Sequence, residues 1–400
     1  MPSSISRWRN AITVSFGLGG IALSTWGPRL PALKADLQLD TGGLGVLLAG
    51  VTVGSVAGLL CAAPVITRFG ARRAIPAVIV LVAASIALVG LGAALPSVPV
   101  VGVGFVVAGF CIGSLDVMIN IDGAAAEEAA GRTLMPLMHA AWSGGAAVGS
   151  GIGAACAALD VSPSKQFLGE AVLIAAAAAF VARNLPDGVR AGQEAPQGPA
   201  SQRLRAWLRG WTDVRLLMIG VVMLGAELGE GSANNWLTLA AEDGHGLDPA
   251  LAALFFTVFA VSEMLTRIAG GPLVDRFGRV ATTRATIALG VVGVVLFILV
   301  DNPVVVLVGV LLWAVGVSMG FPLGMTAAAQ SGPNPAARVS VVAAIGYFAN
   351  LAGPPGVGFL AQSTGLLPAL WLIAVLMLVA FGAAGSFGTR TGRSVQTSNR

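Results

Sequence analysis

Twelve apolar stretches separated by mostly short polar segments run along the chain. They cover residues 10–30, 43–66, 74–95, 98–121, 134–158, 166–185, 215–240, 249–271, 280–300, 304–328, 339–361 and 366–387. Each is close to the roughly 20 residues that cross the hydrocarbon core of a bilayer as an α-helix. The pattern therefore predicts an all-α membrane protein with twelve transmembrane helices.

One polar segment is longer than the others and divides the stretches into two sets of six. We expect an N-terminal six-helix half at 1–185, a cytoplasmic linker at 186–214 and a C-terminal six-helix half at 215–400. Near the end of the linker, Trp207 and Trp211 share an apolar helical face flanked by arginines. This spacing favours an amphipathic helix at the inner membrane interface over a disordered basic linker.

The composition supports a membrane location. The 400-residue chain is 56% hydrophobic and only 10% charged, with a mean hydropathy of +0.85, whereas soluble domains carry about 25% charged residues. The basic residues lie between apolar stretches and form no stripe, so the net charge of +4 does not indicate nucleic-acid binding. Cys61, Cys111 and Cys156 lie within apolar stretches without metal-ligand spacing. We expect no metal and no cofactor.

The distribution of Lys and Arg predicts the orientation. If the N-terminus lies inside, only three of the 23 basic residues, Arg29, Lys34 and Lys165, fall outside. Cytoplasmic loops carry the excess of Lys and Arg in membrane proteins. We therefore expect a multi-pass protein of the plasma or inner membrane with both termini cytoplasmic.

Two loops repeat across the predicted halves. Arg68-Phe69-Gly70 follows the second stretch, and Arg276-Phe277-Gly278 follows the eighth, 208 positions later. A tripeptide at equivalent positions of two six-helix sets indicates an internal repeat. Parallel repeats related by an axis along the membrane normal are a known transporter architecture, with the binding site at midplane between the halves.

The second loop resembles the signature loop of the major facilitator superfamily. Gly271, Leu273, Asp275, Arg276, Gly278 and Arg279 match that pattern, and the first loop is a degraded copy with Ala63 and Thr67 at the Gly and Asp positions. The segments 26–31, 115–120, 230–236 and 346–355 resemble the rhizopine-transport-like and L-fucose-permease-like branch. The resemblance implies the major facilitator fold, with two pseudo-symmetric six-helix halves.

Charges near the inner helix ends are candidates for a latch, meaning a set of contacts that holds the two halves together in one state and releases them in the other. An ordinary cytoplasmic turn is the alternative. The candidate gating and latch residues are Arg68, Arg72, Glu127, Arg132, His139, Glu263, Arg267, Asp275, Arg276 and Arg279. Glu263 and Arg267 are spaced i, i+4, which predicts a helical ion pair, and we favour a structural role for it over substrate binding.

Acidic residues within the seventh stretch are candidates for proton coupling. Glu227, Glu230 and Asn234 lie on one helical face. Two carboxylates one turn apart in a low dielectric do not ionise together easily, so one of them would carry a proton near neutral pH. The alternative is a structural pair that bonds to Ser, Asn or water.

Asp116 in the fourth stretch is a third proton-coupling candidate, and it could instead be an inner-gate partner of Arg132. His139 is either an inert hydrogen-bonded residue or part of the gate. The candidate substrate-binding residues are Trp26, Arg29, Asn120, Trp142, Asn234, Trp236, Tyr347 and Asn350. Interface anchoring is the alternative for the tryptophans, and snorkelling to the interface or an outer gate is the alternative for Arg29.

The sequence contains no phosphate-binding loop and no catalytic motif in the required context, so we expect no enzyme. The favoured function is secondary active transport of a small polar solute, sugar-like or a related metabolite, by alternating access with proton coupling. Metabolite or drug efflux by proton antiport and a non-transporting membrane sensor are the alternatives. The expected partners are the solute, protons and the lipid bilayer, with no nucleic acid, and the expected state is a monomer.

Overall fold

The computed structural model describes residues 3–39, 41–186, 205 and 207–388. The N-terminal half (N-half) contains α1 (Ser3–Ser24), η1 (Gly27–Arg29), α2 (Leu30–Asp36), α3 (Thr41–Phe69), α4 (Ala71–Ala94), α5 (Val98–Ala130), α6 (Met135–Ala158) and α7 (Pro163–Asn184). The C-terminal half (C-half) contains α9 (Val214–Leu239), η2 (Ala240–Gly244), α10 (Pro249–Phe277), α11 (Arg279–Leu299), α12 (Pro303–Ser318), α13 (Gly320–Ala329), α14 (Pro335–Thr364), α15 (Leu366–Ala369), α16 (Trp371–Ala383) and η3 (Ala384–Phe387).

Within the described ranges, nine helices are long and apolar enough to cross a membrane. α1, α6 and α14 complete two six-helix halves and correspond to the first, fifth and eleventh predicted stretches. The tenth stretch is divided at Met319 into α12 and α13. Large apolar side chains such as Val172, Leu173 and Leu378 remain exposed on the surface, as a lipid solvent allows.

The helices pair in the same way in each half. In the N-half α1 packs on α6, α3 on α5 and α4 on α7. In the C-half α9 packs on α14, α10 on α12 and α11 on α16. The equivalent helices therefore occupy equivalent places, which confirms the predicted repeat of two six-helix halves.

Glycines in α6 allow its close approach to α1. A Cβ on Gly145, Gly149 or Gly153 would lie 2.1, 2.5 or 2.9 Å from a backbone oxygen of α1 or of Thr25 just beyond it. The ridge therefore packs two helices of the same half closely together.

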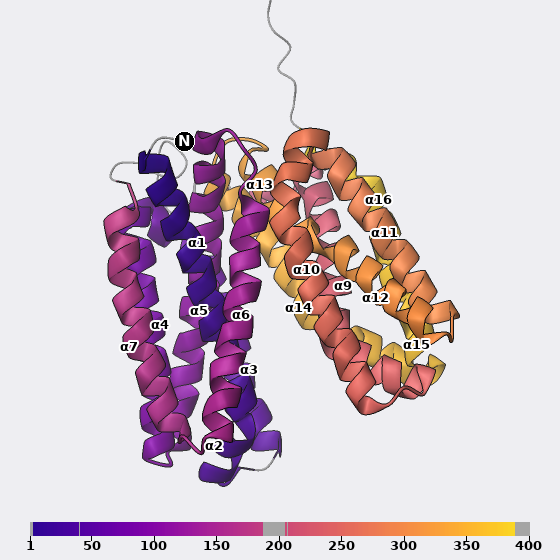
Figure 1. The fold of residues 1–400 in the computed structure, drawn as a ribbon. Coiled ribbons are helices and arrows are strands. Elements are labelled where there is room, and N and C mark those ends of the chain that lie inside the picture. The colour runs from indigo at the N-terminus through magenta and orange to yellow at the C-terminus, as the bar shows by residue number, and fades with distance from the viewer. Residues whose placement is uncertain (1–2, 40, 187–204, 206, 389–400) are drawn as a thin grey trace, which may run out of the picture.

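The two halves lie together at one end of the molecule and diverge toward the other (Figure 1). We call the end at which α1 begins and η3 lies the terminal end, and the end with α2 and α15 the distal end. α6 contacts α10, and α5 contacts α13 and α14 across the two halves. In the linker, residues 207–210 are helical and the Trp207 and Trp211 rings meet edge to face at 5.6 Å. Residues 187–204 of the predicted linker lie outside the described part.

Candidate functional site

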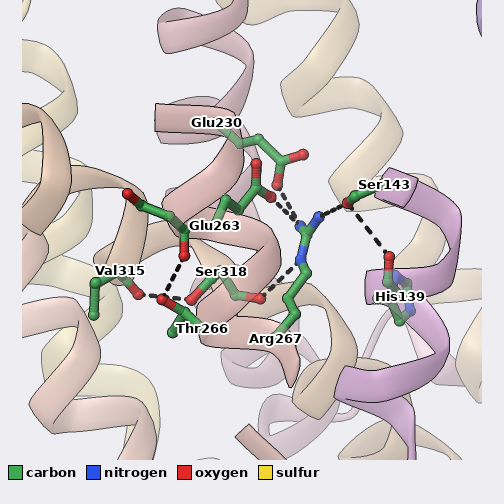
Figure 2. A network of polar contacts seen from close by, with 9 residues as sticks. His139, Ser143, Glu230, Glu263, Thr266, Arg267, Val315 and Ser318 are labelled. Carbon is green, nitrogen blue, oxygen red and sulfur yellow. Dashed lines mark hydrogen bonds and ion pairs between the residues drawn. The ribbon is translucent and has the colours of Figure 1, made fainter. Parts of the chain in front are cut away.

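Arg267 of α10 is the centre of a buried polar cluster (Figure 2). Its guanidinium contacts Glu263 one turn earlier and Glu230 of α9 at 2.8 Å. It also donates to the carbonyl oxygen of Ser318 at 3.2 Å, and across the two halves to the hydroxyl of Ser143 in α6 at 2.8 Å. The predicted contact between Glu263 and Arg267 is confirmed, and Glu230 and Ser143 extend it into a link between the halves.

A second inter-half link involves Asp116 of α5. The hydroxyl of Tyr347 in α14 donates to one carboxylate oxygen of Asp116, and the amide of Asn120 donates to the other at 3.0 Å. The side-chain oxygen of Asn120 lies 3.1 Å from Nε2 of His139. The predicted pairing of Asp116 with Arg132 is wrong for this structure, because Asp116 is buried in this chain of contacts and Arg132 is exposed.

Glu227 lies between these two groups. It is buried on α9, one turn before Glu230, and a Cβ on Gly346 of α14 would lie 3.4 Å from its side chain. Its carboxyl is near enough to act electrostatically on both Arg267 and Tyr347. The polar side chains of both halves thus form one layer at the level where the halves meet.

The layer has more carboxyl groups than basic groups. Glu227, Glu230 and Glu263 share the guanidinium of Arg267, and Glu230 and Glu263 are close enough to interact with each other. A buried charge without a partner is costly in a low dielectric. Three acidic side chains around one guanidinium therefore make this layer the place where the proton-coupling candidates meet the contact between the halves.

The terminal end carries two further polar links between the halves. The side chain of Asp275 in α10 accepts the backbone N–H of Thr133, in the loop between α5 and α6, at 2.8 Å. Glu127 accepts the backbone N–H groups of Leu134 and Met135 at the start of α6, at 2.7 and 2.8 Å. The other oxygen of Glu127 lies 3.5 Å from the guanidinium of Arg279 in α11.

The other latch candidates lie at the surface. Arg68, Arg72, Arg132 and Arg276 are exposed. Arg68 and Arg276 each lie over the phenylalanine that follows, at 5.6 and 5.3 Å from the ring centroid. The structure therefore brings Asp275, Glu127 and Arg279 into the contact between the halves.

His139 joins the halves through ring contacts. It is buried between Phe16 of its own half, at 4.9 Å between ring centroids, and Phe321 of α13, at 5.4 Å. Its Nε2 atom also contacts the side-chain oxygen of Asn120. The imidazole therefore touches α1, α5 and the opposite half. A change in the distance between the halves would alter its surroundings.

The candidate substrate-binding residues lie in different surroundings. Trp26 is buried against Phe105, and Arg29 is buried and donates to the carbonyl of Val161 within the N-half. Trp142 is partly exposed and packs edge to face with Phe16.

On the C-half, Asn234 of α9 is exposed. The ring of Trp236 packs closely on α14, since a Cβ added to Gly358 would lie 3.0 Å from it. The side chain of Asn350 lies outside the described part. Asn120 and Tyr347 are therefore the members of this candidate set that belong to the polar layer.

Two buried acids were missed in the sequence. Asp122 accepts the indole N–H of Trp8 at 2.6 Å, and Glu170 of α7 accepts the hydroxyl of Thr25 and the amide of Gln166. Glu170 follows Gln166 by one helical turn in an apolar stretch, and that spacing was the available signal. Among the described residues, no three His, Cys, Asp or Glu side chains form a group that could hold a metal.

The Major Facilitator Superfamily family model matches residues 12–348 and 232–399, and the chain belongs to this family of membrane transporters. An uncharacterized MFS-type transporter of Yersinia pestis is 28% identical over 93% of both chains. The membrane protein MosC of Rhizobium meliloti is 24% identical over 92% of this chain and 88% of its own.

The fold is also that of solved transporters. The fucose:proton symporter FucP of E. coli superposes with a TM-score of 0.78 at 16% identity, over 95% of this chain and 98% of its own. The predicted membership of the major facilitator superfamily is therefore confirmed by the family model and by the shared fold. At this identity the likeness shows the fold alone.

Proposed function

We propose that the protein moves a small polar solute, sugar-like or a related metabolite, across the membrane by alternating access, and that protons drive it. The observation that carries this proposal is the polar layer between the halves. It contains Glu227, Glu230 and Glu263 around the guanidinium of Arg267, with Asp116 and Tyr347 beside it. Intramembrane carboxyl groups in such a place mark ion or proton pathways in transporters.

The contacts at the terminal end support alternating access. Asp275 and Arg279 hold the α5–α6 region of the N-half, and the halves diverge toward the distal end (Figure 1). The opposite state requires these contacts to break while the distal ends approach. Since the positive-inside distribution predicts cytoplasmic termini, the structure corresponds to an outward-facing state in this proposal.

The contacts of Arg267 would link the protonation of the carboxyl groups to the movement of the halves. A proton on Glu230 or Glu263 would weaken the hold on Arg267, and Arg267 also donates to Ser143 of the other half. Loss or gain of one proton would therefore change an inter-half contact directly. That link between charge and the position of the halves is what coupling requires.

The test uses Glu227→Gln and Glu230→Gln, each reconstituted alone in proteoliposomes. A thermal-shift screen against sugars, polyols, amines and drugs first identifies a solute, because a ligand of the folded state raises its stability. A glutamine resembles the protonated carboxyl but cannot release a proton. We expect the coupling variant to exchange solute at equal concentrations and to fail to accumulate it under a pH gradient.

Glu128→Gln is the matched control, since Glu128 is an exposed residue of α5. It should accumulate solute like the parent protein. If both Gln variants of α9 also accumulate solute normally, the proton site is not Glu227 or Glu230, and Asp116→Asn is next in the same assay. Movement of solute in the direction opposite to proton flow would identify antiport. A ligand that binds but is not transported would identify a sensor.

A further inference from the structure

A cavity lies at the terminal end of the C-half, separate from the polar layer. Its volume is about 340 Å³, within the range of roughly 300–1,000 Å³ that small ligands occupy in proteins. Its lining is formed by Arg215, Arg279, Ala327, Gln330, Ser331, Gly332, Phe387 and Gly388. These residues come from α9, α11, the end of α13 with its following loop, and η3 with Gly388 beyond it.

The cavity is positively charged. Arg215 is the second residue of α9 and Arg279 is the first residue of α11, so both guanidinium groups lie at helix N-termini, where the helix dipole adds partial positive charge. Gln330 and Ser331 add neutral polar groups to the lining. This combination suits an anion with several oxygen atoms.

Of the two arginines, Arg279 alone has a carboxylate partner in the described ranges, Glu127, and this contact is long. The guanidinium of Arg215 donates to the carbonyl oxygens of Ser386 and Gly388, and in the described ranges it has no carboxylate partner. Arg279 donates to Gln330 at 2.8 Å and reaches Glu127 only at 3.5 Å.

The acid two residues before Arg215 is already engaged. Asp213 pairs with Arg338 at 2.6 Å and accepts the backbone N–H of Leu216 at the start of α9. Burial acts to raise the pKa of Asp213, but the hydrogen bond from Arg338 and the backbone N–H groups outweigh it and leave the pKa lowered. Asp213 is therefore ionised and committed to Arg338.

We propose that this cavity binds a phosphate-type anion between Arg215 and Arg279, supplied either as free phosphate or as the headgroup of an anionic lipid. The bound anion competes with Glu127 for Arg279. It thereby weakens the terminal-end contact between α5 and α11 and favours separation of the halves at that end. This inference concerns a regulatory site and does not depend on the proposed solute or on proton coupling.

The binding test titrates inorganic phosphate against purified full-length protein in neutral detergent, with chloride at equal ionic strength as reference. We expect a saturable rise in the midpoint of thermal unfolding with phosphate alone. Arg215→Gln should weaken the apparent affinity about tenfold, because it removes one charge-assisted contact. Arg284→Gln is the control, since Arg284 is an exposed arginine of the same helix as Arg279 and lies over Phe381.

A second arm separates the two sources of the anion. The protein is placed in nanodiscs of phosphatidylcholine with or without phosphatidylglycerol, and native mass spectrometry counts the retained lipids. Retention of phosphatidylglycerol that Arg215→Gln removes and Arg284→Gln keeps identifies a lipid headgroup. Phosphate binding without such retention identifies a free anion. If neither probe binds better than its reference, or if both variants behave alike, the proposed site is wrong.

The competition for Arg279 has its own readout. Spin labels on Glu128→Cys in α5 and Pro333→Cys in the loop before α14 report the distance between the halves at the terminal end, in a background without Cys61, Cys111 and Cys156. We expect the binding anion to lengthen this distance in the parent background and not with Arg215→Gln. Binding with an unchanged distance would overturn the regulatory role.

Discussion

Helices α3 and α10 are equivalent in length and place but differ in what they contact. Each has 29 residues, and they begin 208 positions apart. Each ends in Arg-Phe and is followed by a glycine, and the two glycines have nearly the same positive φ, 77° at Gly70 and 83° at Gly278. The backbone of the signature loop is thus the same in both halves.

The side chains at equivalent positions differ in charge. α10 carries Glu263, Arg267 and Asp275, and α3 carries Ser55, Leu59 and Thr67 at the positions 208 residues earlier. The Ser55 hydroxyl bonds to the carbonyl of Gly109 in its own half, and that of Thr67 bonds to its own helix.

The comparison shows that the repeat fixes the architecture while charges on one copy provide the contacts between the halves. Arg267 and Asp275 both reach the N-half, to Ser143 and Thr133. The two helices are equivalent in backbone, but they differ in the charged contacts that they make with the other half. Substitutions that exchange the residues of α3 and α10 test this directly.

The largest effect is expected for Arg267→Leu, which places the α3 residue in α10. The change leaves the buried Glu263 and the partly exposed Glu230 without their cation, and breaking a buried pair costs about 3–5 kcal/mol. We expect a large fall in thermal stability and loss of transport. The double variant with Glu263→Ser should recover part of the stability, because one uncompensated carboxyl is removed. Stability equal to the parent protein would contradict the central role of Arg267.

The next effect is expected for Asp275→Asn. Asparagine can still accept from the N–H of Thr133, but the charge-assisted part of the bond is lost. We expect the equilibrium between the two states to shift on the order of fivefold toward separation at the terminal end. Transport should slow more than solute binding weakens, because Asp275 lies at the terminal end, away from the polar layer. Unchanged transport with unchanged binding would remove the latch.

A smaller effect is expected from Gly70→Ala and Gly278→Ala, compared as a pair. A Cβ at either position meets nothing within 4 Å, so the cost is backbone strain alone, about 1–3 kcal/mol in each case. We expect equal losses of thermal stability and a change in transport only for Gly278→Ala. Equal transport defects would show that the loop of the N-half also contributes to the latch.

The sequence predicted the helices better than their ends and partners. The fourth stretch was ended at residue 121, but α5 continues to Ala130. Asp122 and Glu127 lie beyond that stretch, yet both are buried because Trp8 and the N-terminus of α6 provide their hydrogen bonds. Burial of a charge depends on a distant partner, which local hydropathy does not contain.

The candidate site shows the same limit. The pair of Glu263 and Arg267 was predictable because helical spacing brings the two side chains together. The contacts of Arg267 with Glu230 and Ser143, and of Tyr347 with Asp116, join separate helices. They depend on the rotation of each helix and on the state of the halves, and a single sequence specifies neither.

The smallest effect is expected for Thr67→Asp, which gives α3 the acid that α10 carries. Thr67 lies at the end of α3, and its hydroxyl bonds to the carbonyls of Ala63 and Pro64, so the aspartate has no preformed N–H partner in the other half. We expect stability within about 0.5 kcal/mol of the parent protein and no change in transport.

The variant is then combined with Asp275→Asn. The double variant should transport as slowly as Asp275→Asn alone, because position 67 has no counterpart of the contact with Thr133. Recovery of transport in the double variant would show that either copy of the loop can hold the halves together. The difference between α3 and α10 would then come from their side chains and not from their places in the structure.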